Sequence, residues 1–149
     1  MMKKSEIHIL MVDKQANKIG EPFMEFLNMN DEQQYIFSLK SCEGYVEALS
    51  MLDEVDIVLL ELDLTREYFI PKDKDFLPWI DEDNAGYRLL AHIRNEYPDV
   101  KVIMLVDYPA CEEPRSEITE IMDKGAHGYL IKSFVVTELV KEVHRVLLA

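Results

Sequence analysis

Charged side chains that could act together follow directly after short apolar runs in this sequence. Asp13 and Lys14 follow the run IHILMV, Glu61 follows VDIVLL, and Lys132 follows GYLI. A carboxylate is a nucleophile and a proton acceptor, and lysines beside it balance its charge. Scattered charges on a solvated surface are the alternative. Because each of these residues ends an apolar run, convergence at one site is the favoured hypothesis.

The apolar runs predict the strands that would position these side chains. They cover residues 7–12, 35–41, 55–60, 100–106 and 128–131. The second run alternates and is the weakest, whereas continuous apolar runs are typical of strands buried on both faces, as in parallel sheets. The carboxyl ends of parallel strands gather at one edge of the sheet. Asp13 and Glu61 are therefore expected to meet Lys132 there, with Lys14 nearby.

Helical periodicity fills the intervals between the runs. Near the C-terminus, apolar residues recur at i, i+3, i+4 and i+7, which places them on one helix face. They are Val136, Leu139, Val140, Val143, Val146 and Leu147. Strand and helix alternate five times, which predicts a single α/β domain over residues 1–149 with a five-stranded, doubly wound sheet.

One connection is longer than the usual two to six residues of such domains. Residues 65–82 lie between the third strand and the third helix. Long loops at a strand's carboxyl end are often functional, and an insertion with its own small apolar patch is the alternative. We expect this insertion to fold over the carboxyl edge of the sheet. Its anchors would be Tyr68, Phe69, Phe76 or Trp79.

Composition limits the function classes. The net charge of -13 argues against nucleic-acid binding, which needs a basic face. Two widely spaced cysteines give neither a zinc motif nor a disulfide framework, and no run is long enough to span a membrane, so a cytoplasmic protein is expected. No glycine-rich loop follows the first strand, which counts against a dinucleotide or flavin enzyme. The histidines are expected at surface or half-buried positions on different elements: His8, His92, His127 and His144.

Four segments, in order, resemble the receiver domains of two-component response regulators over nearly the whole chain. They are ILMVDKQ, DIVLLELDL, AGYRLLAHIRNEYPDVKVIMLV and IMDKGAHGYLIKSF. The resemblance implies a flavodoxin-like three-layer sandwich with strand order 2-1-3-4-5. It also implies that Asp13 and Lys14 occupy the acidic pair after the first strand and that Glu61 occupies the position of the phosphoacceptor aspartate. Lys132 matches the lysine of the family's site, and Tyr129 matches its aromatic switch.

The departures from the family pattern concern the site itself. Lys14 replaces one of the two acidic residues that hold magnesium in the family, and Glu61 replaces the aspartate. Val106 stands where a small hydroxyl residue contacts the phosphoryl group, and Ser133 replaces the proline after Lys132. A peptide bond to a residue other than proline strongly prefers trans. We therefore expect a trans bond between Lys132 and Ser133, with the lysine within salt-bridge reach of a carboxylate.

These substitutions predict a site without phosphoryl chemistry. Magnesium needs hard oxygen ligands, so Lys14 in a ligand position predicts weak or absent Mg²⁺ binding and no other cofactor. The extra methylene of Glu61 shifts its oxygens by somewhat over 1 Å, and a misplacement of that size can reduce an alignment-dependent rate by roughly 100-fold. Glu61 would then be a fixed charge held by Lys14 and Lys132, imperfectly resembling a phosphorylated aspartate.

The leading hypothesis is a degenerate, non-enzymatic receiver-like domain in phosphorelay signalling. The resemblance implies a protein partner or output domain, or a second copy of the chain, on the face of the fourth helix, fifth strand and fifth helix around Tyr129. The rival hypothesis is a phosphotransfer receiver that uses Asp63 or Asp56 with a divalent metal. Asp63 follows Glu61 by two residues, so strand alternation could direct it to the same side, whereas Asp56 should lie at the far end of the strand. A complete chain and a segment of a longer regulator or kinase both fit this sequence.

Overall fold

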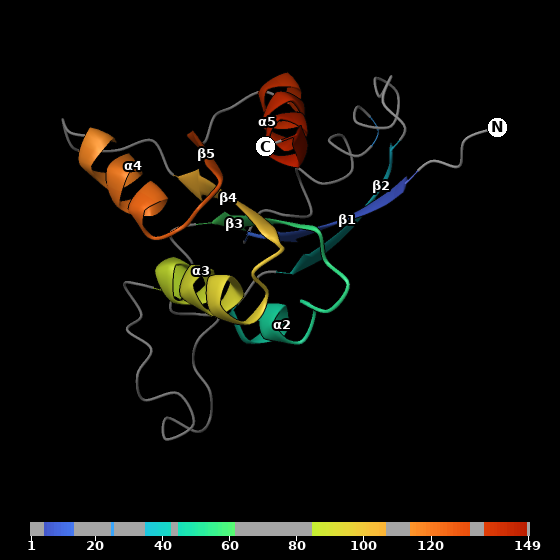
Figure 1. Cartoon of the computed structure of the whole chain (residues 1–149), viewed down its shortest axis with the longest axis horizontal. Helices are drawn as coiled ribbons and strands as arrows, with labels where there is room; N and C mark the ends of the chain where they lie inside the picture. Colours follow the sequence, from blue (N-terminus) through green and yellow to red (C-terminus); the bar gives the residue numbers. More distant parts are fainter. Residues whose placement is uncertain are drawn as a thin grey trace.

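The computed structural model describes residues 5–13, 25, 35–42, 45–61, 85–106, 114–131 and 136–148. Its elements, labelled as in Figure 1, are β1 (Ser5–Val12), β2 (Tyr35–Cys42), α2 (Tyr45–Leu49), β3 (Ile57–Glu61), α3 (Ala85–Glu96), β4 (Lys101–Val106), α4 (Pro114–Asp123), β5 (Gly128–Ile131) and α5 (Val136–Leu148). The insertion expected at 65–82 lies outside the described residues. No helix in the described ranges is long and apolar enough to cross a membrane.

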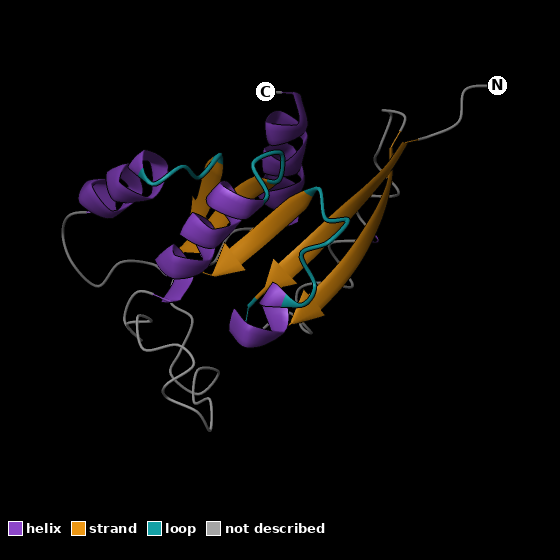
Figure 2. Ribbon diagram, turned by 60° about the horizontal axis from the view of Figure 1, so that its bottom comes forward, coloured by secondary structure: helices purple, strands orange, loops and turns teal. Residues whose placement is uncertain are grey.

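The strands form one five-stranded sheet with the order β2-β1-β3-β4-β5. Every neighbouring pair is parallel, and the arrows in Figure 2 accordingly point the same way. This confirms the predicted flavodoxin-like sheet and its strand order. Because all strands run in one direction, their carboxyl ends share one edge, which is the edge on which the predicted site depends.

Helices cover both faces of the sheet. Figure 1 shows α2 and α3 on one side and α5 on the other, with α4 beside β5 at the end of the sheet. This three-layer arrangement explains why β3 is buried at all five positions and why its sequence is apolar rather than alternating. β2 is an edge strand and alternates between exposed and buried residues, which explains its weaker apolar signal.

Strand alternation divides the core into two clusters. Leu10 and Val12 of β1 pack with Leu60 of β3 on the side of α2 and α3. Met11 and Leu59, which alternate with them, pack on the opposite side against α5. The predicted apolar face of α5 supplies that side with Leu139, Val140, Val143 and Val146, all of which are buried.

A tight turn precedes β3 and delays its start relative to the predicted run. The Val55 N–H donates to the Leu52 carbonyl over 3.4 Å, and the Asp56 N–H donates to the His8 carbonyl over 2.8 Å. Within this turn Glu54 has a φ of 67°, in the left-handed region that favours glycine. The turn is therefore strained at one residue that carries a Cβ.

Replacing Glu54 by glycine is expected to raise the free energy of unfolding by up to about 1 kcal/mol. Left-handed backbone costs an L-residue roughly 1–2 kcal/mol, and the greater freedom of glycine in the unfolded chain offsets part of the gain. Urea unfolding followed by circular dichroism measures the change. Asp99→Gly is the control, since Asp99 is an exposed turn residue without a positive φ. Equal destabilisation by both changes would contradict the strain argument.

Candidate functional site

The carboxyl edge of the sheet carries two charged residues of the predicted site in the described part of the chain. Val12 pairs with Leu60 across β1 and β3, so the residues that follow, Asp13 and Glu61, are neighbours at the ends of adjacent central strands. The Asp13 N–H donates to the Cys42 carbonyl over 3.1 Å, which extends the β1–β2 ladder by one bond. This backbone bond thus fixes the position of the Asp13 Cα atom, to which the side chain is attached.

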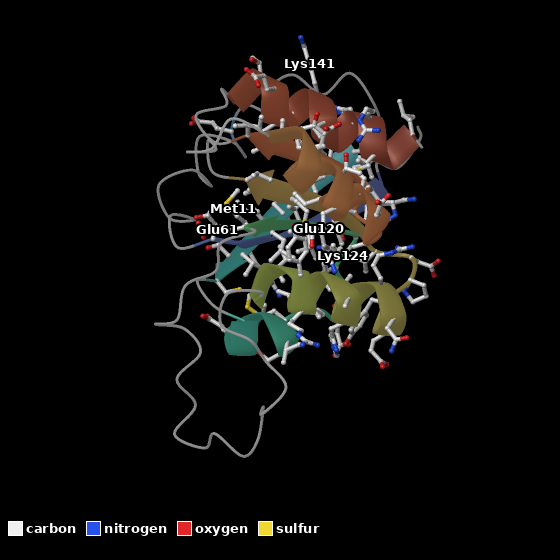
Figure 3. All side chains as sticks on the ribbon, turned by 90° about the vertical axis from the view of Figure 1, so that its left-hand side faces the viewer. Met11, Glu61, Glu120, Lys124 and Lys141 are labelled. Atoms are coloured by element: carbon white, nitrogen blue, oxygen red, sulfur yellow. The ribbon has the colours of Figure 1, made fainter. Side chains whose placement is uncertain are left out.

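Both carboxylates are withdrawn from solvent. Asp13 and Glu61 have exposed fractions of 0%. By strand alternation Glu61 lies on the same side as Leu59, which is the side covered by α5. Figure 3 shows Glu61 close to Met11, which packs on that side too. Burial of a carboxylate is costly unless other groups compensate its charge, so the local structure must supply compensating groups to both side chains.

The remaining charged residues of the predicted site lie outside the described residues. They are Lys14, Asp63 and Lys132. The expected trans bond before Ser133 and the expected lid at 65–82 lie outside them as well, so these remain predictions. Within the described ranges, no group of three His, Cys, Asp or Glu side chains could hold a metal ion. Asp63 lies outside these ranges, and the expectation of weak magnesium binding therefore also remains a prediction.

Val106 and Tyr129 lie on the other side of the sheet from Glu61. Val106 ends β4, is 3% exposed and belongs to the apolar cluster on the side of α2 and α3. Tyr129 is half-buried and packs against the same cluster. Val106 contributes only apolar contacts, so no hydroxyl from this position is available to a bound anion.

Asp56 lies at the opposite edge of the sheet. Its Oδ2 atom accepts a hydrogen bond from the His8 N–H over 2.8 Å, and its carbonyl accepts one from the Lys101 N–H over 3.0 Å. Five residues of strand separate Asp56 from Glu61, which corresponds to about 16 Å. Asp56 therefore joins the middle of β1 to the beginnings of β3 and β4, far from the carboxyl edge.

A hollow of about 550 Å³ opens on the face formed by α4, β5 and α5. Its lining combines apolar and charged side chains: Met122, Gly128, Tyr129, Leu130, Ile131, Glu138, Glu142 and Arg145. Arg145 forms an ion pair with Glu142, one helical turn away. A Cβ at Gly128 would lie 2.6 Å from the Arg145 Nη2 atom, so the absence of a side chain there lets Arg145 lie close to the strand.

His127 has a structural role that the sequence did not reveal. It is half-buried, as expected, but its Nδ1 atom accepts a hydrogen bond from the Val102 N–H over 3.0 Å. Burial lowers the pKa of the His127 imidazole below its usual 6.5, and the positive charges of Arg94, Lys101 and Arg145 lower it further. The only signal in the sequence is a histidine directly before an apolar run, which is too common to indicate such a bond.

Solved structures with the same fold come from response regulators. A response regulator from Thermotoga maritima is 19% identical with a TM-score of 0.67, and the match covers 97% of this chain and 99% of that chain. A CheY-like response regulator receiver domain protein from Methanospirillum hungatei is 18% identical with a TM-score of 0.66, covering 95% of this chain and 93% of that chain. A response regulator receiver domain protein from Clostridium thermocellum is 17% identical with a TM-score of 0.63, and the match covers 94% of this chain and 93% of that chain.

At these identities the likeness establishes the fold over nearly the whole chain. No family model and no curated protein matches the sequence. The roles of the individual side chains must therefore be argued from their own positions and chemistry.

Proposed function

We propose that this chain is a receiver-like domain of phosphorelay signalling that does not accept a phosphoryl group and acts by binding another protein. The observation that carries the proposal is Glu61, a carboxylate with 0% exposure at the carboxyl end of β3. It stands where the resemblance implies a phosphoacceptor aspartate. The fold and its response-regulator neighbours support the signalling role.

Burial and side-chain length both work against phosphoryl transfer to Glu61. The donor must approach in line with the attacking oxygen, and the rate depends almost wholly on alignment and charge neutralisation. A fully buried carboxylate offers a donor no open path, and a shift of about 1 Å can reduce an alignment-dependent rate by roughly 100-fold. Val106 adds no hydroxyl. We therefore assign Glu61 a structural role, with its charge balanced within the fold.

The described residues also fit a magnesium ion poorly. Mg²⁺ demands near-octahedral oxygen ligands and usually keeps several waters when it binds to protein. Asp13 and Glu61 are both fully buried, which leaves little access for a partly hydrated ion. Lys14 follows Asp13 directly and brings a positive charge to a position where the resemblance implies an acidic ligand. No step of the proposed function depends on a metal.

The rival function is phosphorylation at another aspartate, and the two candidates are not equally suited to it. The Asp56 carboxylate lies at the amino edge of the sheet and accepts the His8 N–H. Phosphorylation there would disrupt a bond that joins two strands. Asp63 lies two residues beyond Glu61 on the carboxyl side and is therefore the stronger candidate of the two.

Incubation with acetyl phosphate and Mg²⁺ is expected to leave the mass of the intact protein unchanged. The physical reason is the combination of a buried acceptor, a missing hydroxyl and a lysine in a ligand position. Intact-mass spectrometry makes the measurement, with a competent receiver domain treated in parallel. Addition of a phosphoryl group to the wild type would contradict the proposal. Its loss in Asp63→Asn but not in Asp56→Asn would establish the rival function.

The hollow between α4, β5 and α5 is the proposed surface for the partner. Met122 is 40% exposed and lies beside Leu130 and Ile131 in the lining, so part of this surface is apolar and open. Glu138 and Glu142 lie beside it together with Arg145. Opposite charges beside an apolar strip suit a protein partner or output domain, and they could also pair with a second copy of the chain.

Met122→Glu is expected to weaken partner binding by at least about tenfold, since it puts a charge into the apolar part of the hollow. The matched control is Ile36→Glu, which changes an exposed apolar residue of β2 at the other edge of the sheet. Sedimentation velocity over a range of concentrations tests self-association first. Concentration-dependent dimers that Met122→Glu abolishes identify a second copy as the partner. Equal effects of both variants would contradict the assignment of this face.

A further inference from the structure

The beginning of β5 is attached to β4 through the side chain of His127. The His127 N–H donates to the Val102 carbonyl over 2.8 Å, and the Val102 N–H donates back to the His127 Nδ1 atom over 3.0 Å. A parallel ladder would normally offer a backbone carbonyl to that N–H. Here the imidazole ring takes the carbonyl's place. The bond therefore depends on an unprotonated Nδ1 atom.

The charged groups that act on the ring are positive and come from three elements. The Arg94 Nη1 atom of α3 lies 3.4 Å from the His127 Nε2 atom and also donates to the Pro98 carbonyl over 3.1 Å. Lys101 of β4 and Arg145 of α5 act on the ring as well. Since Nδ1 accepts a hydrogen bond from the Val102 N–H, the neutral ring carries its own proton on Nε2. The contact with Arg94 thus joins two donors and is not a hydrogen bond.

One negative group nearby is engaged with another partner. Glu142 of α5 pairs with Arg145, and Arg145 also donates from Nη2 to the His127 carbonyl over 2.7 Å. Lys124, at the end of α4, points to the ring of Tyr87, with its Nζ atom 5.1 Å from the ring centroid. Within the described ranges, the charged groups acting on His127 therefore disfavour a positive charge on the ring.

We propose that His127 is a pH-sensitive latch, in which protonation of its Nδ1 atom detaches the amino end of β5 from β4. The proton comes from solvent and occupies the lone pair that accepts the Val102 N–H. The two N–H groups then face each other, and the new imidazolium is repelled by Arg94, Lys101 and Arg145. β5 has four residues and, in the described structure, pairs with β4 alone, so few other bonds hold it.

The direction of the pH effect follows from the lowered pKa of His127. The folded protein binds this proton less readily than the unfolded chain does. The stabilisation is therefore complete above the usual value of 6.5 and is lost as the pH falls from there through the folded value. The loss is confined first to β5 and the loop from α4, because local opening precedes global unfolding where contacts are few.

The latch also borders the hollow on the α4–β5–α5 face. Gly128 follows His127 directly and lines the hollow, and so does Arg145, which donates to the His127 carbonyl. Acidification should therefore change the shape of that surface. This last consequence rests on the proposed function, whereas the latch itself is a property of the free chain and is tested without any partner.

Hydrogen exchange of individual amides, measured by NMR between about pH 7.5 and pH 5.5, tests the latch in the free wild-type protein. Protection of the Val102 amide is expected to fall about tenfold relative to that of Leu59 in β3, after correction for intrinsic exchange; this corresponds to the loss of roughly one hydrogen bond. His127→Gln retains an acceptor but does not titrate. In this variant the ratio of the Val102 protection factor to that of Leu59 should therefore not change with pH. His92→Gln, the control at another half-buried histidine, should behave as the wild type does.

Two outcomes would overturn the latch. One is a wild-type ratio between Val102 and Leu59 that stays constant over this pH range. The other is the same fall in His127→Gln as in the wild type, which would assign the effect to another group. A latch that behaves as expected, combined with phosphorylation of the wild type by acetyl phosphate, would overturn only the proposed function. The two proposals can therefore fail separately.

Discussion

The double variant Lys14→Asp, Glu61→Asp is expected to bind Mg²⁺ and to take up a phosphoryl group from acetyl phosphate at least about 100-fold faster than the wild type. The first change supplies an oxygen ligand and removes a positive charge. The second shortens the side chain and moves the acceptor oxygens back by somewhat over 1 Å. The restored alignment should raise the rate of phosphoryl transfer by roughly 100-fold. Each single change should do much less, because metal and acceptor act on the same step.

Calorimetric titration with Mg²⁺ and intact-mass spectrometry measure the two effects. Lys40→Asp, Glu47→Asp is the matched control, since it makes the same chemical changes at exposed residues of β2 and α2. Neither binding nor labelling should appear in the control. An inactive but folded Lys14→Asp, Glu61→Asp protein would contradict the account of the site. It would direct attention to Val106, or to the insertion at 65–82, as the group that blocks the chemistry.

Leu60→Ala is expected to lower the free energy of unfolding by about 2–5 kcal/mol. Leu60 lies in the central strand β3, has 0% exposure and packs in the cluster on the side of α2 and α3. Truncation removes buried apolar surface and leaves a cavity. The neighbouring strands cannot move to fill it, because helices pack on both faces of the sheet. A domain of this size is stabilised by only about 5–15 kcal/mol, so the variant would lose a large fraction of its stability.

Urea unfolding followed by circular dichroism gives the comparison. Ile36→Ala is the control, because Ile36 lies on the edge strand β2 and is 49% exposed; its cost should stay below about 1 kcal/mol. The slope of the unfolding free energy against urea concentration should be the same in both variants as in the wild type if only stability changes. Similar losses for Leu60→Ala and Ile36→Ala would contradict the burial assigned to β3.

The apolar runs and the helical periodicity of the sequence determined the sheet and its core. Continuous apolar runs indicated strands covered on both faces, and the structure has both faces of β3 packed. The spacing along α5 predicted its apolar face: four of the residues are buried and Leu147 is partly buried, whereas the burial of Val136 lies outside the described residues. The strand ends also indicated where Asp13 and Glu61 would lie, since parallel strands bring their carboxyl ends to one edge. These features are local, because a periodic pattern is a property of one element.

Tertiary structure alone decided how these residues are used. The complete burial of Asp13 and Glu61 is a property of the assembled fold, which no local pattern encodes. The bond between Val102 and His127 joins residues 25 positions apart. It forms because the His127 ring, one residue before β5, replaces a backbone carbonyl as the acceptor. The hollow on the α4–β5–α5 face likewise arises only when three elements meet. Sequence period fixes which side of an element is apolar, whereas contact between elements depends on register and packing over the whole fold.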